Sequence, residues 1–378
     1  MNKARYIMIG GFLGAGKTTA VAHLASWLTA KGKRVGLITN DQGTGLVDTT
    51  FLRARGFLTE EIPGGCFCCR FNSLLDAARR LTASARPEVF IAEPVGSCTD
   101  LVATVAYPLR RMYGGDYSVA PLSVLLDPIR AARILGLENG GRFSEKVVYV
   151  YNKQLEEANL LVINKADLID ETRGQRLRDA LASRFPGKEI LTISARTRSG
   201  LENWFARLTT GSQPGGASMD VDYQTYGEGE ALLGWLNATI RVSAREEVDP
   251  NQLLAELASL IQNRLNQQSC EVAHLKMTFN PDGGLGEIAV VNVVRNDLVP
   301  ELSLTFPGAV RSGQVIINLR AEAAPEQLKI MLVNGLVICS GLHPGLSLDV
   351  EHLEYFRPGK PQPTHRDSVL ARTGGESG

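Results

Sequence analysis

The chain has 378 residues, 44% of them hydrophobic and 21% charged, with 40 basic residues against 40 acidic ones. This is the composition of an ordinary globular protein, and the length suits two domains that each bury a core. A formal charge of zero gives no electrostatic signature of binding to nucleic acid or anionic lipid, and no apolar run approaches the ~20 residues of a membrane span. We therefore expect neither nucleic acid nor a membrane as a partner.

Short apolar strands alternate with helices over the first 210 residues. A strand is expected at residues 5–9, and a helix begins at Lys17, after which apolar residues recur every three or four positions. This alternation predicts an α/β fold with a doubly wound, mostly parallel sheet, formed by a first domain of residues 1–210. Nearly continuous apolar runs predict the other strands at residues 34–39, 88–93, 122–127, 160–164 and 189–194.

The pattern changes after residue 210. We interpret residues 211–224, which are rich in glycine and serine, as a linker. Residues 225–341 combine strand and helix patterns, which predict a smaller α+β C-terminal domain, a variant of the ferredoxin-like split βαβ arrangement. Several prolines follow, so residues 342–378 are expected to be an irregular or disordered tail. The strands of this second domain are expected at residues 235–242, 272–279, 287–294 and 314–319, and its helices at 253–261 and 325–335.

A phosphate-binding motif lies between the first strand and the first helix. Gly11, Gly16, Lys17 and Thr18 satisfy G-x-x-x-x-G-K-T. Small residues let backbone N–H groups wrap the phosphates, the lysine reaches the β- and γ-phosphates, and the threonine hydroxyl ligates Mg²⁺. The P-loop residues expected to bind nucleotide are Gly11, Gly14, Ala15, Gly16, Lys17, Thr18 and Thr19.

A second motif indicates which base is bound. The sequence N-K-A-D, which begins at Asn164, follows a buried strand, and parallel sheets hold their ligands at this edge. A carboxylate there accepts hydrogen bonds from the ring N–H and the exocyclic amine of guanine, which adenine does not offer. The next strand ends in S-A, whose backbone can meet the guanine oxygen. The base-binding residues expected from these two motifs are Asn164, Lys165, Asp167, Ser194 and Ala195.

GTP hydrolysis requires a metal ion and charged side chains near the γ-phosphate. Glu93, in E-P-V-G after a buried strand, is expected to hold Mg²⁺, with Asp41 as another carboxylate at the same edge. Lys17, Asp41 and Glu93 are thus the catalytic candidates. Each carboxylate could instead cap a helix. We find no obvious water-positioning glutamine or arginine finger, so slow intrinsic turnover is expected.

Three of the six cysteines, Cys66, Cys68 and Cys69, crowd into the sequence G-G-C-F-C-C. Thiolates are soft ligands that suit Zn²⁺, with Co²⁺ as a borderline case, and three of them leave one tetrahedral position open. Asp41, water or a client residue could fill that position. The same residues contain a C-x-x-C, so a redox device is an alternative, as is chance. Three clustered cysteines do not form a disulfide framework, so a reducing cytoplasm is expected.

Together these motifs resemble the CobW-like P-loop GTPases, relatives of the hydrogenase and urease nickel-insertion GTPases. The resemblance rests on G-G-F-L-G-A-G-K-T-T, N-D-Q-G-T-G-L-V-D, G-G-C-F-C-C, E-P-V-G and N-K-A-D, and it covers roughly residues 5 to 210. It implies GTP-driven handling of a transition metal for delivery to a client metalloprotein. By position, Asp41 matches an acidic residue, usually glutamate, that the family places near both the switch and the metal.

The chain departs from the family in two respects: no histidine-rich run separates the domains, and the second domain matches only in outline. The expected function is a GTP-hydrolysing metallochaperone with GTP, Mg²⁺ and Zn²⁺ or Co²⁺ as cofactors. The expected metal ligands are Cys66, Cys68, Cys69 and Asp41, with Thr18 on Mg²⁺. A homodimer is a candidate assembly. A GTP-gated thiol switch that carries no metal remains the alternative, and a P-loop kinase is disfavoured by the guanine motif.

Overall fold

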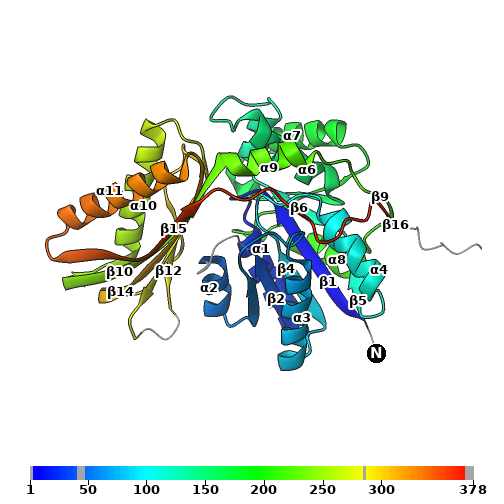
Figure 1. The fold of residues 1–378 in the computed structure, drawn as a ribbon, viewed down its shortest axis with the longest axis horizontal. Coiled ribbons are helices and arrows are strands. Elements are labelled where there is room, and N and C mark those ends of the chain that lie inside the picture. The colour runs from blue at the N-terminus through cyan, green and yellow to red at the C-terminus, as the bar shows by residue number, and fades with distance from the viewer. Residues whose placement is uncertain (1–2, 41–46, 284–286, 371–378) are drawn as a thin grey trace, which may run out of the picture. The chain divides into compact units, whose positions relative to one another are not determined.

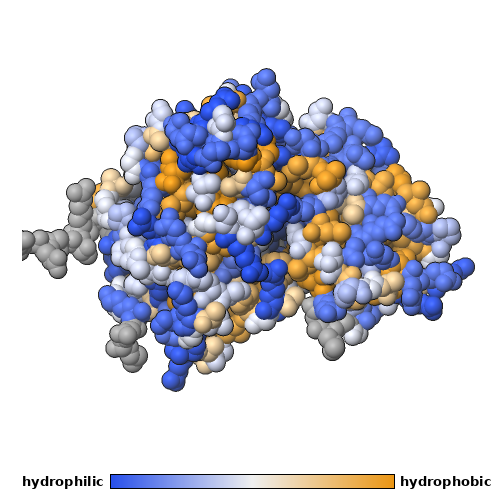
Figure 2. Space-filling model, turned by 180° about the vertical axis from the view of Figure 1, so that it is seen from behind, coloured by the Kyte–Doolittle hydropathy of each residue, from blue (hydrophilic) through white to orange (hydrophobic). Residues whose placement is uncertain are grey.

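The computed structural model describes residues 3–40, 47–283 and 287–370. The chain divides into two compact units (Figure 1). The first unit comprises residues 1–42, 55–226 and 360–378, and the second comprises 43–54 and 227–359. None of the described helices is both long and apolar enough to cross a membrane. On the face seen in Figure 2, hydrophobic residues lie in several separate patches among hydrophilic ones.

The first unit is built on an all-parallel sheet in the order β3-β2-β4-β1-β6-β7-β8, with β5 also paired to β1. This confirms the predicted α/β fold. The central strands are apolar because both faces of the sheet are covered, and β4, β6 and β7 are buried at every residue. The strands are β1 Ala4–Gly11, β2 Val35–Asn40, β3 Thr59–Ile62, β4 Val89–Glu93, β5 Tyr117–Val119, β6 Ser123–Leu126, β7 Leu160–Ile163 and β8 Glu189–Thr192.

Helices connect these parallel strands, since each crossover must return the chain to the same end of the sheet. They are α1 Lys17–Ala30, α3 Phe71–Ala85, α4 Tyr107–Tyr113, α5 Pro128–Ile134, α6 Glu145–Glu157, α7 Glu171–Arg184 and α8 Leu201–Thr210, with a π-helical turn at Val102–Ala106 and a 3₁₀ turn at Ala166–Leu168. Helix α9, Tyr223–Leu232, then leads into the second unit.

The second unit is an antiparallel sheet in the order β13-β12-β11-β14-β10-β15. Strands β10, β11, β14 and β15 with helices α10 and α11 reproduce the predicted split βαβ arrangement, and β12 and β13 extend its edge. A core of aliphatic residues from the sheet and both helices holds it together. The elements are β10 Leu233–Val248, α10 Pro250–Gln267, β11 Val272–Pro281, β12 Ala289–Val293, β13 Glu301–Leu304, β14 Val310–Glu322, α11 Pro325–Leu342 and β15 Leu346–Phe356.

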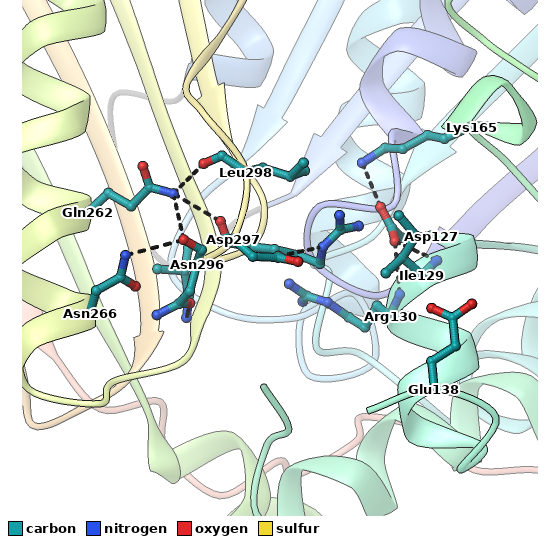
Figure 3. Close-up of polar contacts among 12 residues, drawn as sticks. Asp127, Ile129, Arg130, Glu138, Lys165, Gln262, Asn266, Asn296, Asp297 and Leu298 are labelled. Carbon is teal, nitrogen blue, oxygen red and sulfur yellow. Dashed lines mark hydrogen bonds and ion pairs between the residues drawn. The ribbon is translucent and has the colours of Figure 1, made fainter. Parts of the chain in front are cut away.

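The loop between β12 and β13 is fastened to α10 by one amide side chain. Gln262 Nε2 donates to the carbonyl oxygens of Arg295, Asn296 and Leu298 at 3.1, 3.2 and 2.5 Å (Figure 3). Asn266 Nδ2 adds a bond to Asn296 O at 3.2 Å. These bonds join three backbone carbonyl groups of the loop to the side chains of α10.

Helix α2, Val47–Ala54, belongs to the second unit although its sequence follows β2 of the first. Its first backbone N–H, at Val47, donates to Asn318 Oδ1 at 3.0 Å. The carboxylate of Asp48 pairs with Lys276 of β11. The chain therefore passes from the first unit to the second between β2 and α2.

The expectation of an irregular tail was wrong for residues 346–356, which form β15 along the edge of the second sheet, paired with β10. An edge strand has one side open to solvent, and acidic residues such as Asp349, Glu351 and Glu354 dilute the apolar alternation by which a strand is recognised. The expected linker also contains a short strand: β9, Gly216–Ala217, pairs with β16, Val369–Leu370.

Candidate nucleotide and metal site

The phosphate-binding loop connects the end of β1 to the start of α1, as its motif requires. Gly16 has φ +87°, and a Cβ there would meet Asn164 Nδ2 at 2.5 Å, so only glycine fits. Lys17 and Thr18 are buried at the first turn of α1, and Lys17 Nζ lies 3.5 Å from Phe12 O. The predicted P-loop residues thus sit at the N-terminus of a helix, where backbone N–H groups and the helix dipole favour phosphate.

The predicted base-binding residues converge on this loop. Asn164 Nδ2 donates to Ala15 O at 2.8 Å, and Asn164 Oδ1 accepts from Ala195 N at 3.0 Å. One buried amide therefore joins the P-loop to the S-A loop. Asp167 Oδ1 accepts from Ser194 Oγ at 2.5 Å. The structure brings the N-K-x-D and S-A motifs together at the carboxyl edge of the sheet.

Lys165 is fixed between the P-loop and a helix cap. Its Nζ donates to Gly14 O at 2.7 Å and lies 3.0 Å from Asp127 Oδ2 (Figure 3). Asp127 Oδ1 accepts from the backbone N–H groups of Ile129 and Arg130 at 3.1 and 3.0 Å, which makes it the N-cap of α5. Asp127 therefore serves as a helix-capping carboxylate.

Of the catalytic candidates, Glu93 is well placed for Mg²⁺. Its Oε1 accepts from Thr18 Oγ1 at 3.0 Å, and both side chains are buried. A hydroxyl beside a carboxylate is the oxygen donor set that Mg²⁺ prefers, so these residues fit the ion. Lys17 begins the same helix turn as Thr18. Asp41 lies outside the described residues.

The three clustered cysteines lie in a tight turn between β3 and α3. Cys66 Sγ is 2.7 Å from Cys68 Sγ and 3.0 Å from Cys69 Sγ, and the latter two sulfurs are 3.6 Å apart. Thiolates bound tetrahedrally to zinc at 2.3 Å would be about 3.8 Å apart. The turn therefore needs to open by about 1 Å or less to accept one metal ion on three sulfurs.

Hydrogen bonding within the cluster separates the proton affinities of the thiols. Bonds from Cys68 and Cys69 lower the pKa of Cys66 well below its usual value. The same contacts with Cys66 raise the pKa of Cys68, and that of Cys69 to about 11. Buried Cys98, interpreted from the sequence as a small core residue, also hydrogen-bonds to Cys66 and helps lower its pKa. A metal must therefore displace protons from Cys68 and Cys69.

A polar side chain that sequence analysis passed over links the cysteine turn to the sheet. Asn40, the last residue of β2, donates from Nδ2 to Ile62 O at 2.9 Å and to Gly65 O at 2.6 Å. Gly65 immediately precedes Cys66. The only signal for this role is the position of Asn40 at the carboxyl end of a strand, as the first residue of N-D-Q-G.

The comparison with known families agrees with this geometry. The family model of the CobW/HypB/UreG nucleotide-binding domain matches residues 5–192. These residues belong to the CobW/HypB/UreG family. The matched segment contains the P-loop, the cysteine turn and the N-K-x-D motif, so the expected resemblance is confirmed for the nucleotide-binding domain.

Two curated relatives are named zinc chaperones. Zinc chaperone CobW from Sinorhizobium sp. is 32% identical over 206 residues, which cover 49% of this chain and 57% of the relative. Zinc chaperone YeiR from Escherichia coli K12 is 29% identical over 166 residues, which cover 42% and 46%. The matched part of the chain thus spans about half the length of these relatives.

Two solved structures were also compared. The Helicobacter pylori HypB complex with nickel has a TM-score of 0.41 at 19% identity, covering 55% of this chain and 86% of HypB. Zn(II)-bound YjiA GTPase from Escherichia coli has a TM-score of 0.37 at 14% identity, covering 88% and 99%. Both scores are below 0.5.

In the first unit, which contains the CobW/HypB/UreG domain, a strap formed by residues 360–370 returns over the cysteine turn. Gln362 N donates to Cys69 Sγ at 3.2 Å, and Thr364 N donates to Cys68 O at 2.8 Å. The ring of His365 meets the edge of Phe71, at the start of α3, with centroids 5.0 Å apart. The strap thus covers the metal-binding candidates from a region where the sequence suggested disorder.

Two ion pairs anchor the strap through its neighbouring residues Arg366 and Asp367. Arg366 Nε lies 2.7 Å from Asp100 Oδ2. The side chain of Asp100 is only 1% exposed. Arg111 Nε and Nη2 donate to the two carboxylate oxygens of Asp367 at 2.9 and 3.2 Å. Removing Arg366 would leave the buried Asp100 carboxylate without its arginine partner, which is costly for a desolvated charge.

We expect loss of the strap to expose the cysteine turn. A chain that ends at Gly359 should lose zinc to a chelator about tenfold faster or more, because 1.4 kcal/mol of lost local protection suffices for that factor. Its matched control is a chain that ends at Leu370, which retains all these contacts. Stopped-flow transfer to a chromophoric chelator measures both rates, and equal rates would show that the strap does not guard the site.

Proposed function

We propose that the protein is a GTP-hydrolysing metallochaperone that binds one transition metal, zinc foremost, at Cys66, Cys68 and Cys69 and passes it to a client metalloprotein. The observation that carries this proposal is that the cysteine turn is connected to the nucleotide edge of the sheet. Three mutually close thiols lie in a turn that is hydrogen-bonded to the end of β2, at the nucleotide edge of a CobW/HypB/UreG domain. The relatives named zinc chaperones support zinc as the cargo.

GTP is the proposed nucleotide because the Asp167 carboxylate lies beside Ser194 at the base-binding edge. Lys17 would neutralise the β- and γ-phosphates, and Thr18 with Glu93 would hold Mg²⁺, which supplies charge stabilisation when bound. Asp41 is proposed as a further acidic group of this region. The proposal invokes no arginine finger, so intrinsic turnover should be slow.

In this proposal zinc is the cargo of the protein rather than a resident cofactor. Three cysteine sulfurs leave one tetrahedral position for water, Asp41 or a donor from the client, and an exchangeable position is what transfer requires. Free thiols need a reducing compartment, which favours the cytoplasm. A homodimer is compatible with this scheme and is not required by it.

The alternative of a metal-free thiol switch fits the burial less well. Cys66 and Cys68 are only 4% and 1% exposed, and thiols that exchange disulfides with partners must be reachable. Cys69 is the more accessible of the three, but the hydrogen bond with Cys66 keeps it protonated, since its pKa rises to about 11. A buried cluster that opens slightly for a metal suits transfer better than surface redox exchange.

The proposed coupling runs through the end of β2. Asn40 holds Gly65 beside the cysteines, and the chain that follows Asn40 leads into α2, which is bonded to the second sheet. A γ-phosphate that changes the position of this segment would thereby change metal affinity. The test compares zinc affinity in the GDP-bound protein and in the protein bound to a non-hydrolysable GTP analogue. Different affinities support the metallochaperone, and identical affinities leave only a GTPase that contains zinc.

A further inference from the structure

The C-terminal domain holds a second group of metal-binding side chains. Glu256 of α10 and Cys339 and His343 at the end of α11 bring a carboxylate oxygen, a thiol sulfur and an imidazole nitrogen within 4.8 Å of one another. We propose that this triad is a second zinc site, so that the chain binds two metal ions rather than one. This inference stands apart from the proposed function, because it involves neither the nucleotide nor the cysteine motif.

The packing of two helices explains why these three side chains meet. A Cβ on Gly335 of α11 would lie 3.2 Å from Ile261 and 3.6 Å from Leu257, so the missing side chain lets α11 approach α10 closely. Cys339 follows Gly335 by four residues on the same face of α11, and His343, the C-cap residue, follows Cys339 by four more. Glu256 lies beside Leu257 on the facing helix.

The triad has a buried sulfur atom and two other donor side chains that are partly exposed to solvent. Cys339 is fully buried, whereas the side chains of His343 and Glu256 are 31% and 24% exposed. His343 Nε2 already lies 2.7 Å from Glu256 Oε2. An ion can therefore enter from solvent, reach the sulfur, and keep a water molecule as its fourth ligand.

The chemistry of the donors selects the ion. One thiolate, one imidazole and one carboxylate form a borderline set that suits Zn²⁺ better than Mg²⁺ or Ca²⁺. Neighbouring donors around tetrahedral zinc are about 3.3–3.7 Å apart, so shifts of about 1 Å would complete the site. The C-terminal end of α11 also favours a positive charge through the helix dipole.

The competing explanation is an ion pair, His343 with Glu256, above a thiol that only fills the core. Both explanations predict that the triad contributes to folding, so stability alone does not separate them. Only a metal site makes zinc affinity depend on all three residues at once. Zinc binding in a chain without the cysteine cluster is therefore the deciding quantity.

The experiment uses the full chain with Cys66→Ser, Cys68→Ser and Cys69→Ser, so that only other sites remain. This chain should retain one zinc per molecule in a titration against a chromophoric chelator. Adding His343→Ala or Glu256→Gln should weaken zinc at least about tenfold, because even the loss of an outer-sphere partner costs 10- to 100-fold. Co²⁺ should show the charge-transfer band of a single thiolate, and Cys339→Ser should remove it.

Two matched replacements serve as controls. Cys270→Ser alters another buried thiol of the same domain, and His352→Ala alters an exposed imidazole on β15. Neither should change zinc affinity. Zinc should also raise the unfolding temperature of the triple-serine chain but not that of its His343→Ala derivative.

Two results would overturn the proposal. The first is a triple-serine chain that binds no zinc, and the second is one whose affinity is unchanged by His343→Ala and Glu256→Gln. If the chain with Cys339→Ser fails to fold, the His343→Ala and Glu256→Gln replacements at partly exposed positions still test the proposal.

Discussion

Replacing Cys66, Cys68 and Cys69 by serine in a chain that also carries His343→Ala should abolish zinc binding. The His343→Ala background removes the triad of the C-terminal domain, so only the cysteine cluster is counted. We expect the affinity to fall at least about 1,000-fold, or about 4 kcal/mol, because all three protein thiolates are lost. Competition with a chromophoric chelator measures the change.

The absorption spectrum of bound Co²⁺ tests the same prediction. The parent His343→Ala chain should show thiolate-to-cobalt charge transfer from three sulfurs, and the serine chain should show none. Affinity in the parent should fall as pH falls, because protons compete for Cys68 and Cys69, whose pKa values are raised by their contacts with Cys66. Cys270→Ser is the matched control, and an unchanged zinc affinity in the triple-serine chain would contradict the site.

The second large effect concerns the base. Asp167→Asn should weaken GTP at least about 100-fold, since a carboxylate that accepts two hydrogen bonds from guanine is replaced by an amide that repels one donor. The same change should strengthen xanthosine triphosphate, whose C2 oxygen accepts from the new amide. In the unaltered protein, GTP should bind at least about 100-fold tighter than ATP.

Asp170→Asn is the control for this prediction. Asp170 caps α7 by accepting from Arg173 N at 2.8 Å, and asparagine caps a helix nearly as well. It should leave nucleotide preference unchanged. Fluorescence titration with labelled nucleotides measures all of these affinities, and equal binding of ATP and GTP by the unaltered protein would rule out Asp167 as the guanine reader.

The nucleotide site could be predicted because each motif is local. Glycines, Lys17 and Thr18 stand between one strand and one helix, and the N-K-x-D residues end another strand of the same sheet. Parallel strands end at one edge, so the meeting of the two motifs follows from the fold. The bond from Asn164 to Ala15 O adds detail that no spacing in the sequence reveals.

The strap and the second metal group could not be predicted for the same physical reason. The contact between Gln362 and Cys69 joins positions 293 residues apart and uses a backbone N–H, which any non-proline residue supplies. Likewise, Cys339 and His343 are one helical turn apart, but their carboxylate partner lies on another helix. Asn40 was missed because a single polar residue at a strand end has many ordinary roles.

A metallochaperone driven by GTP requires that nucleotide binding and metal binding change each other's affinity. Zinc should therefore be titrated into the His343→Ala chain holding either GDP or a non-hydrolysable GTP analogue, with Mg²⁺ constant. A coupling of 1–3 kcal/mol would change zinc affinity by a factor of about 5 to 150, and zinc must change the affinity of the analogue by the same factor. Asn40→Ala, which breaks the bond to Gly65 O, should bring that factor toward one. Identical zinc affinities in the two nucleotide states of the parent chain would contradict the central claim.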